Sequence, residues 1–361
     1  MSLNATWEQV LDRVGTVDQV ASATPVTLTE GSASGVRALD VRTIDGLHAT
    51  VLLDRGMDIA QAWYRGAPLA WTSPTGPVHP AFAAGGDWLA SFHGGLLVTC
   101  GTQNLGHACV VDGVRHSFHG AVSNTPARGV RWSVERDPPA VVVEGVVREV
   151  RVLGADVELR RRLRFEVASP RLLVEDAVTN LDDRPAPLLL LYHLNLGWPV
   201  IDASSRLFGW PAAVRALPGD RWSEAASDAA IAAGDHDRFA PPTPDWPIQV
   251  FEHAGEDDAD SRTVGVLNPA YEPTDGLAVA VTYRPSELPY LRRWRMLRRR
   301  TYLMGIEPCT SPVGGREELH ERGLLPLLAP GETRRFSVSF TVGAGDAARG
   351  LADRGTEEEQ P

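Results

Sequence analysis

The stretch LLLLYHLNLGWP, residues 188–199, combines an unbroken apolar run with a histidine near its end. An apolar run of this length is typical of a strand that is buried on both faces. His193 would then lie at the rim of a core, where its surroundings can shift its pKa. Taken alone, the stretch allows two interpretations: a core histidine satisfied by one hydrogen bond, or a residue that transfers protons.

Short β-rich runs on both sides of this strand predict an all-β protein. They include GVRALDVRTIDG, AVVVEGVVREVRV, DVELRRRLRFEV and TRRFSVSFTVG, and Gly, Pro, Asn or Asp punctuate the chain between them. Serial strands separated in this way are typical of antiparallel sheets, so we expect a large sandwich. Near the N-terminus, Trp7, Val10 and Leu11 recur at helical spacing after Thr6, which predicts one short amphipathic helix.

The pattern predicts one main domain. We expect a helical extension over residues 1–20, a single β domain over 21–345 and an acidic, mobile tail over 346–361, because AARGLADRGTEEEQP lacks apolar periodicity. Two irregular segments, residues 73–92 and 211–247, are rich in turn-forming residues such as Pro and Gly and interrupt the strands. Each either flanks a binding cleft or is a surface excursion.

Composition narrows the class of partner. The 361 residues carry a formal net charge of −11, which would repel a phosphate backbone and disfavours nucleic acid. No apolar window is long enough for a membrane span, and the N-terminus lacks a signal pattern, so we expect a cytoplasmic protein. Three cysteines without CxxC spacing predict free thiols and no structural metal site. A homodimer is left open.

One basic cluster needs its own interpretation. In LRRWRMLRRR, residues 291–300, arginines interleave with apolar side chains. This alternation favours a half-exposed strand with a solvated arginine face. An anion site for a phosphorylated or carboxylated ligand is the alternative.

Two further regions carry polar groups suited to a ligand site. HGGLLVTCGTQNLG (93–106) and HSFHGAVSNTPAR (116–128) contain His93, Asn104 and His119 among glycines that let the backbone approach a ligand or make tight turns. In TYLMGIEPCTSP (301–312), Glu307 follows an apolar run, where burial can raise the pKa of a carboxylate toward the acid-base range. Glu307 could instead cap a turn or pair with an arginine of residues 291–300.

Together these residues resemble galactose mutarotase-like proteins. The HG turn at His119, the later His193 within LYHLNLG and Glu307 within GIEPCT follow the order His, His, Glu of that family's catalytic residues. More closely, RGMDI, PLAWTSPTG, GLLVTCGTQNLG and LYHLNLGWPVID are similar to the DUF4432 branch of aldose 1-epimerase-like proteins, over roughly residues 30–342. The resemblance implies a β-supersandwich that binds a small-molecule carbohydrate in a cleft on one sheet and needs no cofactor. The histidines lack short metal-ligand spacing, so we expect no metal, and a site assembled from distant His and Glu residues is the alternative.

The resemblance also implies roles. Glu307 would be the base that removes the proton of the anomeric hydroxyl, and His193 the acid that faces it across the sugar and protonates the ring oxygen. His119 would orient the ring oxygen side or share the proton. The expected substrate contacts are Arg55, His93, Asn104, Asn195 and Trp198. The residues after His193 depart from the family's usual Tyr-Phe-Asn, which predicts different local sugar contacts.

The predicted activity is therefore that of an isomerase, an aldose 1-epimerase-like enzyme. Two alternatives share the same cleft. One is an isomerase or lyase that abstracts a proton beside the carbonyl of an oxidised sugar. The other is a carbohydrate-binding protein without turnover.

Overall fold

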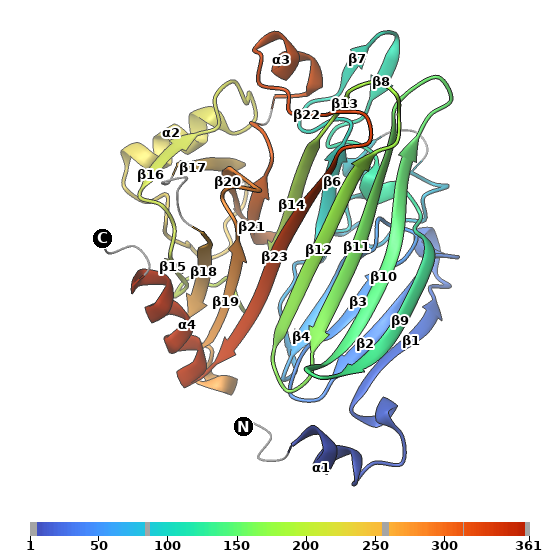
Figure 1. The fold of residues 1–361 in the computed structure, drawn as a ribbon. Coiled ribbons are helices and arrows are strands. Elements are labelled where there is room, and N and C mark those ends of the chain that lie inside the picture. The colour runs from blue at the N-terminus through green and yellow to red at the C-terminus, as the bar shows by residue number, and fades with distance from the viewer. Residues whose placement is uncertain (1–5, 84–86, 255–259, 313, 358–361) are drawn as a thin grey trace.

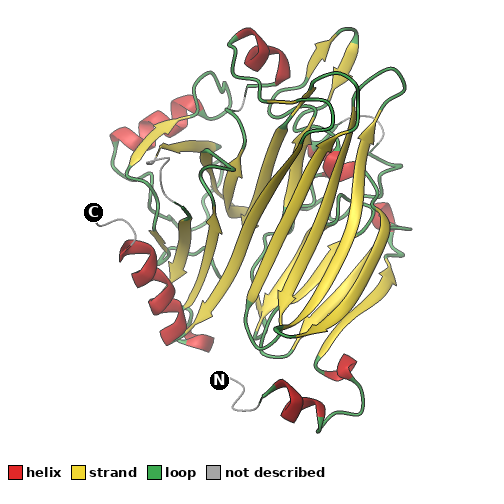
Figure 2. Ribbon diagram, viewed as in Figure 1, coloured by secondary structure: helices red, strands yellow, loops and turns green. Residues whose placement is uncertain are grey.

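The computed structural model describes residues 6–83, 87–254, 260–312 and 314–357. Three antiparallel sheets build the fold, and the all-β prediction is confirmed (Figures 1 and 2). The four α-helices of the described part are α1 (Trp7–Leu11), α2 (Glu224–Ala232), α3 (Arg316–Glu321) and α4 (Asp346–Glu357). Within these ranges no helix is both long and apolar enough to cross a membrane.

The largest sheet has eight strands. Its order is β15 (Arg206–Phe208), β18 (Arg262–Asn268), β19 (Leu277–Tyr283), β23 (Thr333–Ala344), β12 (Arg171–Asn180), β11 (Asp156–Glu166), β10 (Pro139–Val150) and β9 (Arg128–Arg136). Along β12 buried residues alternate with partly exposed ones, as expected when one face packs on a core and the other meets solvent.

The other two main sheets pack against this one. A six-stranded sheet runs β16 (Ala213–Ala216), β17 (Gln249–Ala254), β20 (Tyr290–Arg298), β21 (Thr301–Cys309), β14 (Leu189–Leu196) and β6 (Val98–Thr102). A five-stranded sheet runs β1 (Ala21–Thr27), β2 (Arg37–Thr43), β3 (His48–Leu52), β4 (Asp58–Tyr64) and β5 (Ala67–Pro68). Two short two-stranded sheets, β7 (Cys109–Val111) with β8 (Val114–His116) and β13 (Ala186–Pro187) with β22 (Leu327–Leu328), complete the strands. One hydrophobic core joins residues of all three sheets, such as Leu39, Leu163 and Leu190.

Strand β14 is the element that the opening stretch predicted. All eight of its residues are buried, because its two neighbours β6 and β21 pair along it and packed side chains cover both faces. A buried polar network fixes it in place. Tyr192 donates a hydrogen bond to Asp176 on β12 (2.8 Å), and Arg161 on β11 pairs with both Asp176 (2.7 Å) and Asp58 on β4 (3.3 Å). Arg161 also donates to Thr99 on β6, so one network ties the three sheets together beside His193.

Both chain ends carry helices. The predicted short N-terminal helix is present as α1, and Thr6 and Gln9 form a capping box at its start. Residues 346–357 of the tail form α4 and residues 358–361 lie outside the described part, so the mobility expected of the tail stays a prediction. Ala348 is fully buried against Phe208 of β15 and Ala278 of β19, since Ala348 and Ala352 share one face of α4.

The solvated arginine face expected for residues 291–300 is wrong for the first half of that stretch. Arg292, Arg293 and Arg295 are at most 1% exposed, because β20 is an interior strand whose two faces are both covered. The guanidinium of Arg293 lies 4.6 Å from the ring centroid of Phe251, and Arg295 donates to Gln249 at 2.9 Å. Only residues 298–300, at the end of the strand and beyond it, are exposed.

Candidate active site

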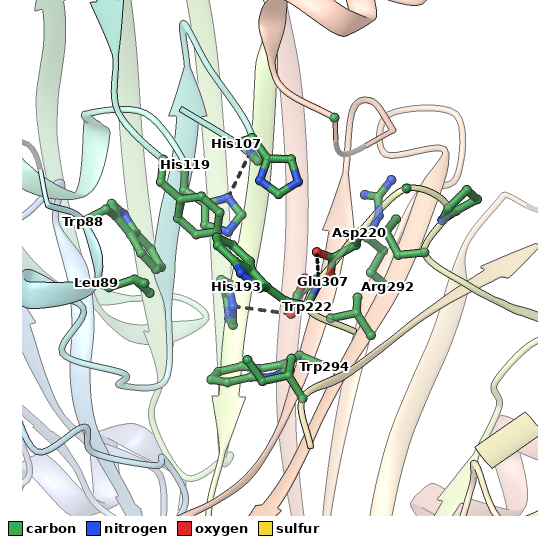
Figure 3. A pocket seen from close by; sticks show the side chains of 18 of the residues that line it. Trp88, Leu89, His107, His119, His193, Asp220, Trp222, Arg292, Trp294 and Glu307 are labelled. Carbon is green, nitrogen blue, oxygen red and sulfur yellow. Dashed lines mark hydrogen bonds and ion pairs between the residues drawn. The ribbon is translucent and has the colours of Figure 1, made fainter. Parts of the chain in front are cut away.

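A cavity of about 280 Å³ lies on one face of the six-stranded sheet (Figure 3). The sheet contributes His193 from β14, Glu307 from β21, Arg292 and Trp294 from β20 and Val250 from β17. The two irregular segments that interrupt the strands supply much of the rest of the lining. Residues 88, 89 and 92 come from the segment 73–92, and residues 217–220 and 222 come from the segment 211–247. Of the two alternatives left open for these segments, the cavity lining favours the one in which both flank a cleft.

His193 and Glu307 meet at the base of the cavity. The register of β14 and β21 pairs Leu191 with Cys309 and Leu194 with Ile306, which puts His193 opposite Glu307 on one face of the sheet. Their atoms Nε2 and Oε1 are 3.4 Å apart, and both side chains are 7% exposed. Direct contact differs from the expected arrangement, in which the two residues face each other across a sugar.

Burial shapes the protonation of this pair. It lowers the pKa of His193, and the negative charge of Glu307 opposes that shift. Nδ1 of His193 is buried and has no hydrogen-bond partner among the described residues. The pair is therefore a carboxylate and an imidazole in contact with each other and largely removed from solvent.

His119 stands on the next wall, with its ring centroid 6.4 Å from that of His193. The backbone N–H of Gly106 donates to its Nδ1 at 3.3 Å, so the neutral ring carries its proton on Nε2. Burial lowers the pKa of His119 well below 6.5, which keeps the ring neutral near pH 7. The HG turn is needed here: Gly120 has φ of 75°, and a Cβ on it would lie 2.2 Å from the carbonyl oxygen of Gly101.

Aromatic side chains form the remaining walls. Trp88, Phe92, Phe118, Trp222 and Trp294 line the cavity, and the ring centroid of Trp294 is 5.6 Å from that of His193. Such rings offer apolar surface with a polar edge, which suits a ligand that has both C–H faces and hydroxyls. None of the five was selected from the sequence as a site residue. The available signal was the position of Trp88, Phe92 and Trp222 inside the two irregular segments.

Arg292 brings a positive charge to the cavity wall. Its register partners are Glu307 on β21 and Glu252 on β17, and it pairs with Glu252 at 3.0 Å. Two of its nitrogens also donate to the backbone oxygen of Ser311 at 3.2 Å, while its buried Nε has no partner in the described ranges. Glu307 thus pairs with His193. The alternative that the sequence had left open, a pair between Glu307 and an arginine of β20, is not the arrangement found.

The side chains expected to contact substrate lie elsewhere. The described residues that line the cavity do not include Arg55, His93, Asn104, Asn195 or Trp198. The buried guanidinium of Arg55 donates to three backbone carbonyls, and burial lowers its pKa to about 10. His93 is 1% exposed, and Trp198 is 59% exposed at the surface.

The two asparagines hold the backbone around the site. Asn104 donates to the carbonyls of His107 and Ser117 at 2.9 and 2.8 Å, which fixes the loop that carries His119. Asn195 donates to the carbonyls of Gly95 and His193, both at 3.1 Å. Within the described residues, no group of three or more His, Cys, Asp or Glu side chains is arranged to hold a metal ion.

Comparison with solved structures identifies the fold. A structure described as a "putative aldose 1-epimerase" from Klebsiella pneumoniae subsp. pneumoniae superposes with a TM-score of 0.81 at 23% identity, covering 94% of this chain and 92% of that one. A galactose mutarotase-like protein from Clostridium acetobutylicum gives a TM-score of 0.61 at 13% identity, covering 90% and 99%. The galactose 1-epimerase from Lactobacillus acidophilus NCFM gives 0.53 at 13% identity, covering 90% and 99%.

The protein therefore has a galactose mutarotase-like fold, as its sequence predicted. Among curated proteins no sequence match was found. The chain belongs to the family described as "Domain of unknown function (DUF4432)", whose model matches residues 33–342.

Proposed function

We propose that this protein is an aldose 1-epimerase-like enzyme that interconverts the anomers of a reducing sugar or sugar derivative. The observation that carries the proposal is the His193–Glu307 pair, 3.4 Å apart at the base of an aromatic cavity. The neighbouring structures support it, because several of them are described as aldose 1-epimerases or galactose mutarotase-like proteins.

The adjacency of the pair suits this chemistry. In mutarotation the anomeric hydroxyl loses a proton while the ring oxygen gains one, and both oxygens are bonded to the same carbon. An acid and a base that act on the two oxygens must therefore lie side by side. Glu307 takes the hydroxyl proton, protonated His193 gives its proton to the ring oxygen, and the bond between the anomeric carbon and the ring oxygen breaks to leave an open-chain aldehyde.

The second half-reaction reverses these transfers. After rotation about the bond next to the carbonyl, His193 recovers the proton from the hydroxyl that attacks the other face of the carbonyl. Glu307 returns its proton to the new anomeric oxygen. The pair begins and ends with one proton, so no external acid or base is consumed. Each positioned transfer typically contributes about 10² to 10⁴ in rate.

His119 completes the donor set in this proposal. Its Nδ1 accepts from Gly106, so its Nε2–H is available to a sugar oxygen, and its low pKa keeps it from competing for the proton of the pair. We assign it a positioning role at the ring oxygen. His193 and Glu307 are each 7% exposed, and low exposure to solvent strengthens the electrostatic interactions at the reacting atoms.

Anomer interconversion of a panel of reducing sugars, followed by NMR or polarimetry, tests the proposal. We expect Glu307→Gln to lower kcat by at least about 10², since the amide cannot accept the hydroxyl proton. Glu144→Gln on the eight-stranded sheet is the matched control and should keep full activity. An unchanged rate in Glu307→Gln would rule out the assigned base.

A heavy-water experiment separates this reaction from proton abstraction beside a carbonyl. Mutarotation exchanges only protons bonded to oxygen, so the recovered sugar should carry no deuterium on carbon. Deuterium at the carbon next to the carbonyl would favour the isomerase or lyase alternative.

A further inference from the structure

A second, wider chamber of about 660 Å³ adjoins the catalytic cavity. The two chambers share six lining residues: Trp88, Leu89, His107, Phe118, Gly219 and Trp222. The chamber that contains His193 and Glu307 is called the inner chamber here, and the one that adds Asp87, Ala108, Arg115 and Arg221 the outer chamber. A ligand whose reacting end reaches His193 can therefore extend past Trp88 and Trp222 into the outer chamber.

The inner chamber is too small for much more than one ring. Its volume of about 280 Å³ lies just below the roughly 300–1,000 Å³ that sites for drug-sized ligands occupy. The outer chamber more than doubles the space beside the same walls. The site as a whole accommodates a sugar that carries a substituent at the end remote from its anomeric carbon.

The two chambers differ in the sign of their charge. The inner chamber is lined by the carboxylates of Asp220, Glu307 and Glu318, and the charge of Arg292, its only described arginine or lysine, is balanced by Glu252 behind it. An anionic group would be repelled there. An anionic group of the ligand would therefore be more favourably placed outside the inner chamber, away from His193 and Glu307.

The outer chamber is basic. Arg115 on β8 and Arg221 after β16 both line it, and no described carboxylate forms an ion pair with either guanidinium. The guanidinium of Arg221 lies 5.2 Å from the ring centroid of Trp222, a stacking that restrains it at the junction of the two chambers. The one described carboxylate in the lining, Asp87, accepts from the backbone N–H groups of Leu89 and Ala90. The outer chamber thus gathers two arginines without a described carboxylate partner, although the whole chain has a net charge of −11.

We infer that the substrate is a reducing sugar with an anionic group, such as a phosphate or carboxylate, at the end remote from the anomeric carbon, and that Arg115 and Arg221 bind this group. Guanidinium groups match the planar pairs of oxygens on carboxylates and phosphates. This inference deepens the proposed function and rests on it for the placement of the anomeric carbon at His193 and Glu307.

Four sugars test the inference: glucose, maltose, glucose 6-phosphate and glucuronate. Their kcat/KM values for anomer interconversion should favour an anionic sugar over glucose by about tenfold or more, which corresponds to about 1.4 kcal/mol. Arg115→Gln and Arg221→Gln should lower kcat/KM for the anionic sugars by about tenfold and should lower it much less for glucose, which has no anionic group for them to bind. Arg335→Gln, an exposed arginine on β23, is the matched control and should keep the preference.

Three results would overturn the inference. Equal kcat/KM for glucose and both anionic sugars would remove the anion from the substrate class. A preference for maltose over both would assign the outer chamber to a neutral second sugar. An equal loss for glucose and the anionic sugars in Arg115→Gln and Arg221→Gln would assign these arginines a structural role.

Binding separates failure of this inference from failure of the proposed function. Trp88 and Trp222 line both chambers, so their fluorescence reports occupancy without turnover. If no sugar is interconverted but glucose 6-phosphate or glucuronate binds about tenfold tighter than glucose in an arginine-dependent manner, the mutarotase assignment fails and the anionic ligand class stands. If the anionic sugars bind no tighter than glucose, the ligand class fails whatever the activity. The preference should also weaken as salt is raised from about 0.01 to 0.1 M, which shortens the Debye length from about 30 to 10 Å.

Discussion

His193 and Glu307 share one proton in the proposed reaction, so activity depends on the pair holding that proton before the sugar binds. Burial lowers the pKa of His193 below its ordinary 6.5, and Glu307 only partly offsets the shift. The protonated fraction of the pair therefore falls as pH rises through a value below 6.5. A lowered pKa makes protonated His193 a stronger acid beside the base Glu307. It also means that a smaller fraction of the enzyme carries the required proton at neutral pH.

The expected pH profile follows from this sign. We expect kcat/KM to fall by about tenfold per pH unit on the alkaline side of an apparent pKa that lies below 6.5. Initial rates between pH 5 and 8, corrected for spontaneous mutarotation, measure it. His119→Gln should lower the rate but keep the midpoint of this limb, since burial lowers the pKa of His119 well below 6.5 and the limb is assigned to His193. A rate that rises between pH 6 and 8 would contradict the role of His193 as the acid.

At the scale of elements, β14 shows why part of the site was predictable. Its continuous apolar run is typical of a strand buried on both faces, and a histidine in such a strand needs a polar neighbour. That neighbour, Glu307, follows an apolar run of its own. The family order of His119, His193 and Glu307 linked the three residues, and the cavity brings them together.

Strand β20 shows where sequence reasoning ends. Alternation of arginines with apolar residues usually indicates a solvated face, but burial depends on what packs over a strand, and the sequence of the strand does not contain that information. The covering residues come from β17 and from the segment 235–246, far away in the chain. For the same reason the five expected substrate contacts could not be separated from residues that hold loops.

The network around β14 leads to a prediction on stability. The Tyr192 hydroxyl is fully buried and donates to the charged acceptor Asp176. Tyr192→Phe should lower the free energy of unfolding by about 1.5–3 kcal/mol, the usual contribution of a hydrogen bond to a charged group. Urea unfolding measures it. Tyr302→Phe, which removes a hydrogen bond to the neutral carbonyl of Ala240, is the matched control and should cost about 0.5–1.5 kcal/mol.

Activity per folded molecule gives the second readout of Tyr192→Phe. Tyr192 and His193 are adjacent in a strand, so their side chains point to opposite faces of the sheet. We expect kcat/KM to stay within about twofold of the wild type, a difference of roughly 0.4 kcal/mol. A large loss of activity with unchanged stability would mean that the network acts on the reacting pair rather than on the fold.

The whole molecule keeps several histidines buried and neutral, and its stability must depend on pH as a result. Burial lowers the pKa of His93, His119 and His193, and it lowers that of His253 to about 3. In the unfolded chain each would titrate near 6.5. Acid therefore adds protons to the unfolded state first, and the folded state loses stability as pH falls below 6.5.

His253 isolates this effect from catalysis, because it lies outside both chambers. Its Nδ1–H donates to the carbonyl of Pro211 at 3.1 Å, and its Nε2 accepts from Arg293 at 3.3 Å. Protonation would remove that acceptor and place a cation against the guanidinium. The contribution of His253 is therefore fully present above pH 6.5 and is lost at about 1.4 kcal/mol per pH unit as pH falls toward 3.

His253→Gln tests this account, because glutamine does not titrate and still offers a donor and an acceptor. We expect the variant to be less stable than the wild type at pH 7.5, and the gap to narrow by up to about 1.4 kcal/mol per unit as pH falls below 6.5. Urea unfolding from pH 7.5 to 5 measures the gap, and Asp58, whose buried carboxyl has a pKa raised to about 6, contributes equally to both proteins and cancels. His320→Gln in α3, an exposed position, is the matched control. A gap that stays constant over this range would show that His253 is protonated in the folded protein as readily as in the unfolded chain.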